Sequence, residues 1–131
     1  MPYITALYAA LLALLVVALA IRIALYRMKH RIGLGDGGHP RLLRLMRAHG
    51  NAVEYIPLGV LLLALLELCG APATGLHVAG VSLLLARVLH AAGVTRAAGA
   101  GVGRSGGAGL TFVVLVAMAI WLLVLVLPHW R

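Results

Sequence analysis

Apolar residues are gathered into four long blocks along the chain, and polar and glycine-rich stretches lie between them. We expect the blocks to form helices over residues 3–26, 40–68, 76–92 and 107–128. Each block approaches the ~20 residues that a helix needs to cross a bilayer. None shows the strict alternation of apolar and polar side chains that is typical of membrane β-barrels. The pattern therefore predicts an all-α integral membrane protein, a four-helix bundle that forms a single domain over residues 1–131.

The composition favours a membrane rather than water as the solvent of these helices. Hydrophobic residues make up 63% of the chain and charged residues 11%, whereas a soluble domain is about half apolar and about a quarter charged. A net charge of +8 is also found in proteins that bind nucleic acid, but here the basic residues lie between the apolar blocks. That placement points to membrane topology as its cause, so we expect no nucleic-acid partner.

The basic residues also predict how the chain crosses the membrane. Eight of them lie in the first and third connections or at the start of the second helix: Arg27, Lys29, Arg31, Arg41, Arg44, Arg47, Arg96 and Arg104. Only Arg131 belongs to the other side. Because basic loops stay in the cytoplasm, we expect both termini outside and the two basic connections inside. The first block lacks a preceding basic segment and a suitable cleavage site, so we expect a retained helix.

Four polar residues near the start of the second block share one helix face, whereas His49 falls on the opposite side. At about 100° per residue, Arg44, Arg47, Asn51 and Glu54 fall within an arc of about 80°. Side chains along this face change from basic to amide to acidic, so its basic entrance suits a carboxylate and its acid suits an ammonium group. Ionisable residues inside a membrane indicate a functional site, although such a network can also serve only to hold helices together.

The third block ends in a second polar pair. Arg87 and His90 are three residues apart and share a helix face. Arg87 lies deep enough to need a partner, which we expect to be Glu54 or a bound anion; a purely structural Arg87–Glu54 pair is the alternative. Glu67 lies near the far end of the second block, where we expect a solvated helix end.

Motifs for several other chemistries are missing from the sequence. The six histidines and the single cysteine lack the spacing of metal ligands, so we expect no metal site. The glycine-rich third connection lacks the Gly-Lys-Ser/Thr ending of a phosphate loop, and the chain has no Gly-x-Ser-x-Gly elbow.

One set of residues resembles a known family. The pattern Arg47-x-x-x-Asn51-x-x-Glu54-Tyr55-x-Pro57, near the start of the second of four membrane helices, is similar to the signature of the MAPEG proteins. These membrane-associated proteins in eicosanoid and glutathione metabolism include microsomal glutathione transferases and the leukotriene and prostaglandin E synthases. The stretch "IGLGDGG" resembles bacterial members, and "ARVLHAAG" and the later "RS" resemble the third helix and the start of the fourth. The resemblance covers most of the chain.

The resemblance implies a homotrimer in a bacterial inner membrane, with glutathione held between neighbouring subunits near the cytoplasmic face. By the family pattern, Arg47, Asn51 and Glu54 would bind the polar groups of the tripeptide. Arg87 and His90 would line the same pocket from the third helix. Glutathione carries two carboxylates, one ammonium group and a thiol, so several arginines and one acid suit it.

The resemblance also implies a reaction. Arg104, with Ser105 beside it, matches the arginine that stabilises the glutathione thiolate, and Arg27 is a looser match to a basic residue at the end of the first helix. A free thiol has a pKa of about 8.5, which a nearby guanidinium lowers. The thiolate would then attack an apolar electrophile from the lipid, as a glutathione-dependent transferase or peroxidase does. Val94 stands where many members have a tyrosine, so activation would depend more on Arg104 and Ser105.

Two other functions fit parts of the pattern. A small proton-coupled exporter of apolar cations would use Glu54, but the nearby arginines would repel its cargo. A non-catalytic membrane assembly protein would use the polar cluster only to fix helix packing.

Overall fold

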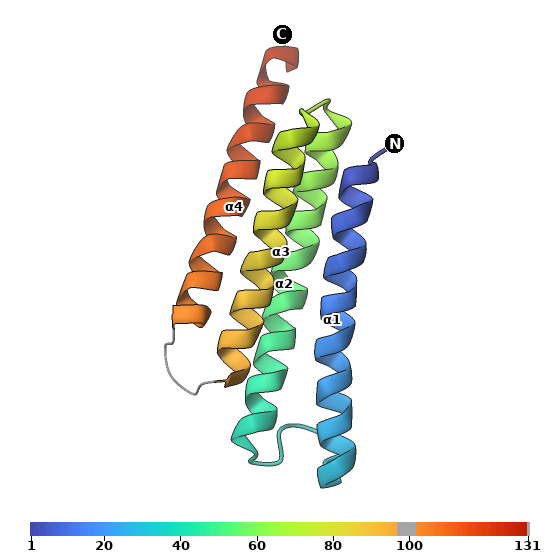
Figure 1. The fold of residues 1–131 in the computed structure, drawn as a ribbon, viewed down its shortest axis with the longest axis vertical. Helices are drawn as coiled ribbons and strands as arrows, with labels where there is room; N and C mark the ends of the chain where they lie inside the picture. Colours follow the sequence, from blue (N-terminus) through green and yellow to red (C-terminus); the bar gives the residue numbers. More distant parts are fainter. Residues whose placement is uncertain (97–101, 131) are drawn as a thin grey trace.

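The computed structural model describes residues 1–96 and 102–130 and consists of helices within them (Figure 1). The helices are α1 (Tyr3–His30), α2 (Pro40–Leu68), α3 (Ala73–Arg96) and α4 (Val102–Val126), followed by the short 3-10 helix η1 (Leu127–Trp130). The described part of the chain contains no strand. The glycine-rich stretch at 97–101 and Arg131, which the charge count included, lie outside the described residues.

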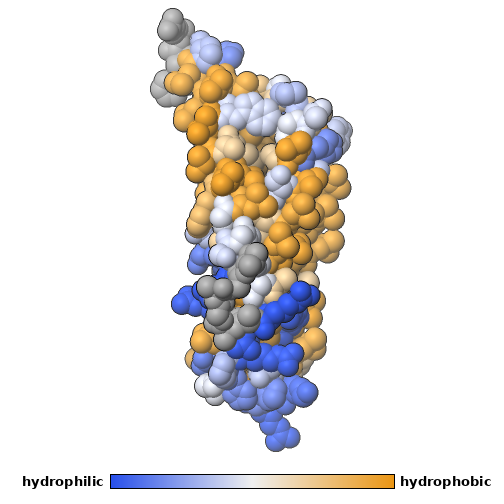
Figure 2. All heavy atoms as spheres, turned by 60° about the vertical axis from the view of Figure 1, so that its left-hand side comes forward, coloured by the Kyte–Doolittle hydropathy of each residue, from blue (hydrophilic) through white to orange (hydrophobic). Residues whose placement is uncertain are grey.

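The four long helices pack as an up-and-down bundle with both termini at one end (Figure 1). The opposite end, called here the connection end, is where α1 and α3 finish and α2 and α4 begin. All four helices are long and apolar enough to cross a membrane. Figure 2 shows apolar side chains over the upper part of one face and hydrophilic side chains gathered at the connection end.

α1 is longer than the apolar block that predicted it, because its basic last turn continues the helix to His30. Arg27, Lys29 and His30 lie in that turn, where positive charge is favoured by the helix dipole. Arg31 then adopts a left-handed conformation with φ 55°, and the amide of Ile32 donates to the carbonyl of Arg27 at 3.0 Å. Pro40 begins α2, as the sequence suggests.

Glu67 is partly exposed at the end of α2, as expected, and it also caps another helix, which the sequence did not predict. Its carboxylate accepts the amide of Ile4 at 2.9 Å through Oε1 and the amide of Thr5 at 2.7 Å through Oε2. The first amides of a helix have no partner within it, and no side chain of α1 itself caps them. The end of α2 lies beside the start of α1, so the acid of one helix caps the other.

Glycines let α4 approach α3 closely at the connection end. A Cβ on Gly107 would lie 2.5 Å from the backbone nitrogen of His90, and one on Gly93 would collide with the backbone nitrogen of Arg104. Small residues permit this backbone contact between membrane helices. The contact fixes the first turn of α4 against the last turns of α3.

Candidate functional site

A pocket of about 520 Å³ opens at the meeting of α2, α3 and the start of α4. Its lining combines polar side chains from all three helices with a few apolar ones: Leu43, Met46, Arg47, Gly50, Asn51, Glu54, His90, Val94 and Arg104. Five of the residues predicted from the sequence therefore lie around one cavity. Ligand pockets commonly have volumes of about 300–1,000 Å³, so the cavity has the size of a small-molecule site.

The wall contributed by α2 contains three of the four residues of the expected polar stripe, since Arg44 is outside the lining. Arg47 and Glu54 are exposed, and Asn51 lies half-buried between them. The opposite side of α2 is anchored in the core by fully or nearly fully buried apolar residues, which are Leu42, Leu45, Ala48 and Ala52. Burial of that side leaves the stripe to face the pocket.

Arg87 lies behind this wall and is almost completely buried, with 1% of its surface exposed. Its Nη2 donates to Oδ1 of Asn51 at 2.6 Å, and its Nη1 donates to the hydroxyl of Thr111 at 3.3 Å. The guanidinium carbon lies 5.8 Å from the ring centre of Tyr55. Arg87 therefore joins α3 to α2 and α4 through neutral groups.

Arg87 does not form the expected ion pair with Glu54 in the described residues, and the other expected partner, a bound anion, stays a prediction. Within the described ranges, no carboxylate forms an ion pair with Arg87, whose partners are the amide of Asn51 and the hydroxyl of Thr111. Asn51 points from the stripe toward the bundle interior, whereas Glu54 is exposed at the pocket. Nor does Arg87 line the pocket, as the family pattern suggested; it supports the wall from behind.

His90 connects the pocket to the start of α4. It is 6% exposed, and its Nδ1 lies 3.0 Å from the backbone carbonyl oxygen of Arg104. A carbonyl oxygen only accepts, so Nδ1 carries the hydrogen and a neutral ring keeps Nε2 as an acceptor. The same bond holds the backbone of Arg104 at the mouth of the pocket, where its exposed side chain forms part of the lining. Ser105 follows on the exposed side of that first turn and is outside the lining.

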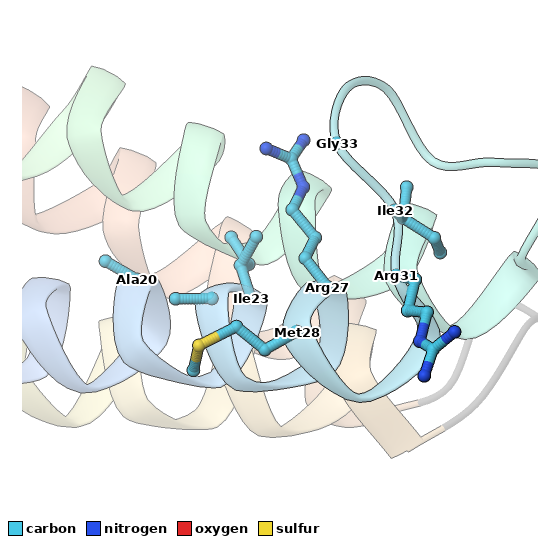
Figure 3. Close-up of a pocket in the computed structure, with 8 residues that line it drawn as sticks. Ala20, Ile23, Arg27, Met28, Arg31, Ile32 and Gly33 are labelled. Atoms are coloured by element: carbon cyan, nitrogen blue, oxygen red, sulfur yellow. The ribbon is translucent and has the colours of Figure 1, made fainter.

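Arg27 occupies a different cavity within the chain. This second pocket, of about 550 Å³, lies at the end of α1 and is lined by Ala20, Ile23, Ala24, Arg27, Met28, Arg31, Ile32 and Gly33. Figure 3 shows the side chain of Arg27 extending away from Met28. Its Nη2 donates to the carbonyl of Gly35 at 3.0 Å and contacts the sulfur of Met46 at 3.8 Å. Because Met46 also lines the α2–α3–α4 pocket, Arg27 lies next to that pocket but outside it.

Sequence reasoning missed Thr111 as part of this region. Its hydroxyl is buried in α4, accepts from Arg87 and donates to the carbonyl of Gly107 at 2.8 Å. The available signal was a lone hydroxyl in a helical block without charge, since a buried polar group in a membrane helix needs a partner.

Comparisons with known proteins show the family of the chain. The model of the MAPEG family matches residues 5–124. The chain is also similar to the inner membrane protein YecN of Escherichia coli strain K12, with 41% identity over 87 residues, or 66% of each chain. YecN of Escherichia coli O6:H1 gives the same identity and coverage. The match thus spans just under two thirds of the length of these relatives, and the four helices together with an inner-membrane relative support a multi-pass inner membrane protein.

Proposed function

Since this chain belongs to the MAPEG family, we propose that it is a membrane-embedded enzyme that uses the thiol of glutathione against apolar electrophiles. The observation that carries the proposal is the combination of Arg47, Glu54 and Arg104 around one pocket between three helices. Arg47 and Glu54 complement a carboxylate and the ammonium group of the tripeptide, and Arg104 is left for its thiol. The reaction would be a transfer to the electrophile or the reduction of a peroxide.

The α2 wall would hold the polar ends of the tripeptide. Arg47 would bind a carboxylate through paired hydrogen bonds, and Glu54 would accept from the ammonium group. Asn51 has a defined orientation, because Arg87 can only donate and the amide oxygen must therefore face it. The amide NH₂ of Asn51 is then directed to other partners, and a ligand carboxylate would be one of them.

Arg104 would stabilise the thiolate form of the glutathione sulfur. A guanidinium beside the thiol favours the thiolate, and each unit by which the pKa falls from about 8.5 corresponds to about 1.4 kcal/mol. Val94 lines the same pocket and offers no hydroxyl. Activation of the thiol would therefore depend on Arg104, with Ser105 beside it. Apolar electrophiles are concentrated in the bilayer and would enter from there.

We further propose that the protein assembles as a homotrimer, as its family resemblance implies, in which a neighbouring subunit covers the open side of the pocket. Arg47, Glu54 and Arg104 are exposed in the single chain, and this exposure supports a trimer. Without a neighbouring subunit, a charged ligand would contact the protein on one side only. The gathering of basic residues at the connection end supports an orientation with the pocket facing the cytoplasm and both termini outside.

Calorimetry with glutathione, on protein in detergent or nanodiscs, tests the function. We expect saturable binding that Arg47→Ala and Glu54→Ala each weaken. Arg96→Ala removes an exposed cation outside the pocket and should leave binding unchanged. Binding should also raise thermal stability, by about 2.7 kcal/mol at a hundred times Kd. The absence of saturable binding in all these conditions would refute the proposal.

A further inference from the structure

A third, strongly basic pocket of about 260 Å³ lies between α1 and the start of α2. Its lining comes from one stripe of α1 and two residues of α2: Arg22, Leu25, Tyr26, Lys29, His30, Arg41 and Leu45. The α1 residues recur at intervals of three and four, as side chains on a single helix face do. The pocket shares no lining residue with the candidate glutathione site.

Tyr26 organises the centre of this pocket. Its hydroxyl lies 3.2 Å from Nδ1 of His39, and its ring stacks on His30 with the ring centres 4.3 Å apart. The guanidinium carbon of Arg41 lies 5.8 Å from the centre of the same ring. These contacts hold cationic and aromatic groups of two helices around one small cavity.

The chain has no acid to neutralise this pocket. None of its three acidic residues is in the lining. Asp36 accepts the amide of Gly38 at 3.2 Å, Glu54 lines the candidate glutathione site, and Glu67 caps α1 at the opposite end of the bundle. Through the whole described part of the chain, no carboxylate forms an ion pair with Arg22, Lys29 or Arg41. The counter-charge must therefore come from outside the chain.

The position of the pocket indicates where that anion comes from. Arg22 lies within the candidate span of α1, eight residues or about 12 Å before its last residue His30. Leu25 and Leu45 give the same pocket apolar walls. An anion that combines negative charge with hydrocarbon, as a phospholipid at the membrane interface does, fits both the cations and the apolar walls.

We propose that this pocket binds the phosphate of an anionic phospholipid. Arg22, Lys29 and Arg41 would contact the phosphate oxygens, since guanidinium and ammonium groups form charge-assisted hydrogen bonds with phosphate. Leu25 and Leu45 would contact the upper part of the acyl chains. The site is independent of glutathione binding.

Native mass spectrometry of the detergent-solubilised protein, reconstituted with phosphatidylglycerol or phosphatidylcholine, tests this site. We expect wild-type protein to retain phosphatidylglycerol in preference to phosphatidylcholine. Arg22→Gln and Arg41→Gln should each reduce that retention about tenfold, the effect of losing one charge-assisted contact. Arg96→Gln removes a cation outside the pocket and should retain the lipid as wild type does. Equal retention by Arg41→Gln and Arg96→Gln would overturn the proposal, as would equal retention of the two lipids by wild type.

A second measurement separates a lipid headgroup from free phosphate and does not depend on lipid retention. Short-chain phosphatidylglycerol and inorganic phosphate are added at equal concentrations, and the thermal midpoint of the protein is followed in detergent. We expect the lipid to raise the midpoint of wild type and Arg96→Gln but not that of the Arg22→Gln/Arg41→Gln double variant. Inorganic phosphate should have little effect, because it has no chains to contact Leu25 and Leu45. An equal rise with phosphate, or a rise in the double variant, would overturn the assignment to a lipid.

Discussion

Arg87 donates a hydrogen bond of 2.6 Å from Nη2 to Oδ1 of Asn51, and this bond joins the buried interior of the bundle to the wall of the pocket. The bond divides the hydrogen-bonding groups of Asn51 between two roles. Its side-chain oxygen accepts from the buried Arg87, and its NH₂ group can donate to a ligand in the pocket. Substitutions that remove one role and keep the other can separate helix packing from ligand binding.

Asn51→Asp keeps an acceptor for Arg87 but removes the NH₂ group. We expect this variant to fold with nearly wild-type stability and to bind glutathione more weakly, because it lacks a donor and adds a negative charge. Asn51→Leu should instead lower stability by about 1–3 kcal/mol, the cost of leaving a buried donor without its partner. Thermal unfolding and calorimetry on the same preparations give both quantities. If the polar cluster served only helix packing, Asn51→Asp would leave every ligand response unchanged.

Arg104 and Arg47 should affect different kinetic parameters. Arg104→Ala should lower kcat for conjugation of an apolar halonitrobenzene at neutral pH, by about tenfold for each unit of thiol pKa that the guanidinium supplies. Raising the pH toward about 8.5 should restore part of the rate, since the thiolate then forms without help. Arg47→Ala should mainly raise KM for glutathione. Equal losses in kcat for both variants at every pH would contradict these separate roles.

Gly106 and Gly107 are neighbours that offer a matched pair of substitutions. A Cβ on Gly107 meets the backbone of His90 at 2.5 Å, whereas a Cβ on Gly106 has nothing within 4 Å. We expect Gly107→Ala to push α4 from α3, to destabilise the protein by about 1–3 kcal/mol and to impair catalysis through displacement of Arg104. Gly106→Ala should be neutral or slightly stabilising, because alanine favours helix over glycine. Thermal midpoints and initial rates of the two variants provide the comparison.

The cap made by Glu67 is expected to matter for stability and not for catalysis. Glu67→Ala removes both acceptors from the amides of Ile4 and Thr5 and should cost about 0.5–2 kcal/mol. Glu67→Gln keeps one carbonyl oxygen and should cost less. Hydrogen exchange at those two amides should accelerate in both variants, most in Glu67→Ala. Unchanged exchange there would show that the amides do not depend on this carboxylate.

The exporter remains the alternative that assigns Glu54 a different task. It requires proton release from liposomes when an apolar cation is added, and loss of that release in Glu54→Gln. We expect no such release from the wild-type protein, since Arg47 and Arg104 line the same pocket as Glu54 and would repel a cation. Proton release that depends on Glu54 would favour transport over catalysis.

The parts of the site that lie on one helix could be predicted from the sequence. Arg47, Asn51 and Glu54 share a face because the helical period fixes their relative directions, and the structure places all three at one pocket. The number of helices also follows from local sequence, because a span is recognised by its own length and apolar content.

Relationships between helices could not be predicted in the same way. The hydrogen-bond partner of Arg87 depends on how α2 is rotated about its axis relative to α3. A rotation of a few tens of degrees determines whether Asn51 or Glu54 faces the guanidinium. The cap at α1 joins Glu67 to amides more than sixty positions away along the chain, and nothing in the local sequence marks it. Arg27 was assigned from resemblance alone, and within one chain it contacts Met46 without lining the pocket.

The burial of Arg87 has a consequence for how the protein is inserted. An arginine at the centre of a helix raises the apparent free energy of membrane insertion by about 2.5–3.5 kcal/mol. Arg87 therefore makes the insertion of α3 by itself less favourable. Its strongest partner, Asn51, belongs to α2, which is synthesised earlier and is joined to α3 by a short turn. The translocon can therefore receive α2 and α3 as one hairpin in which Nη2 of Arg87 already donates to Asn51, while Nη1 gains Thr111 only when α4 arrives.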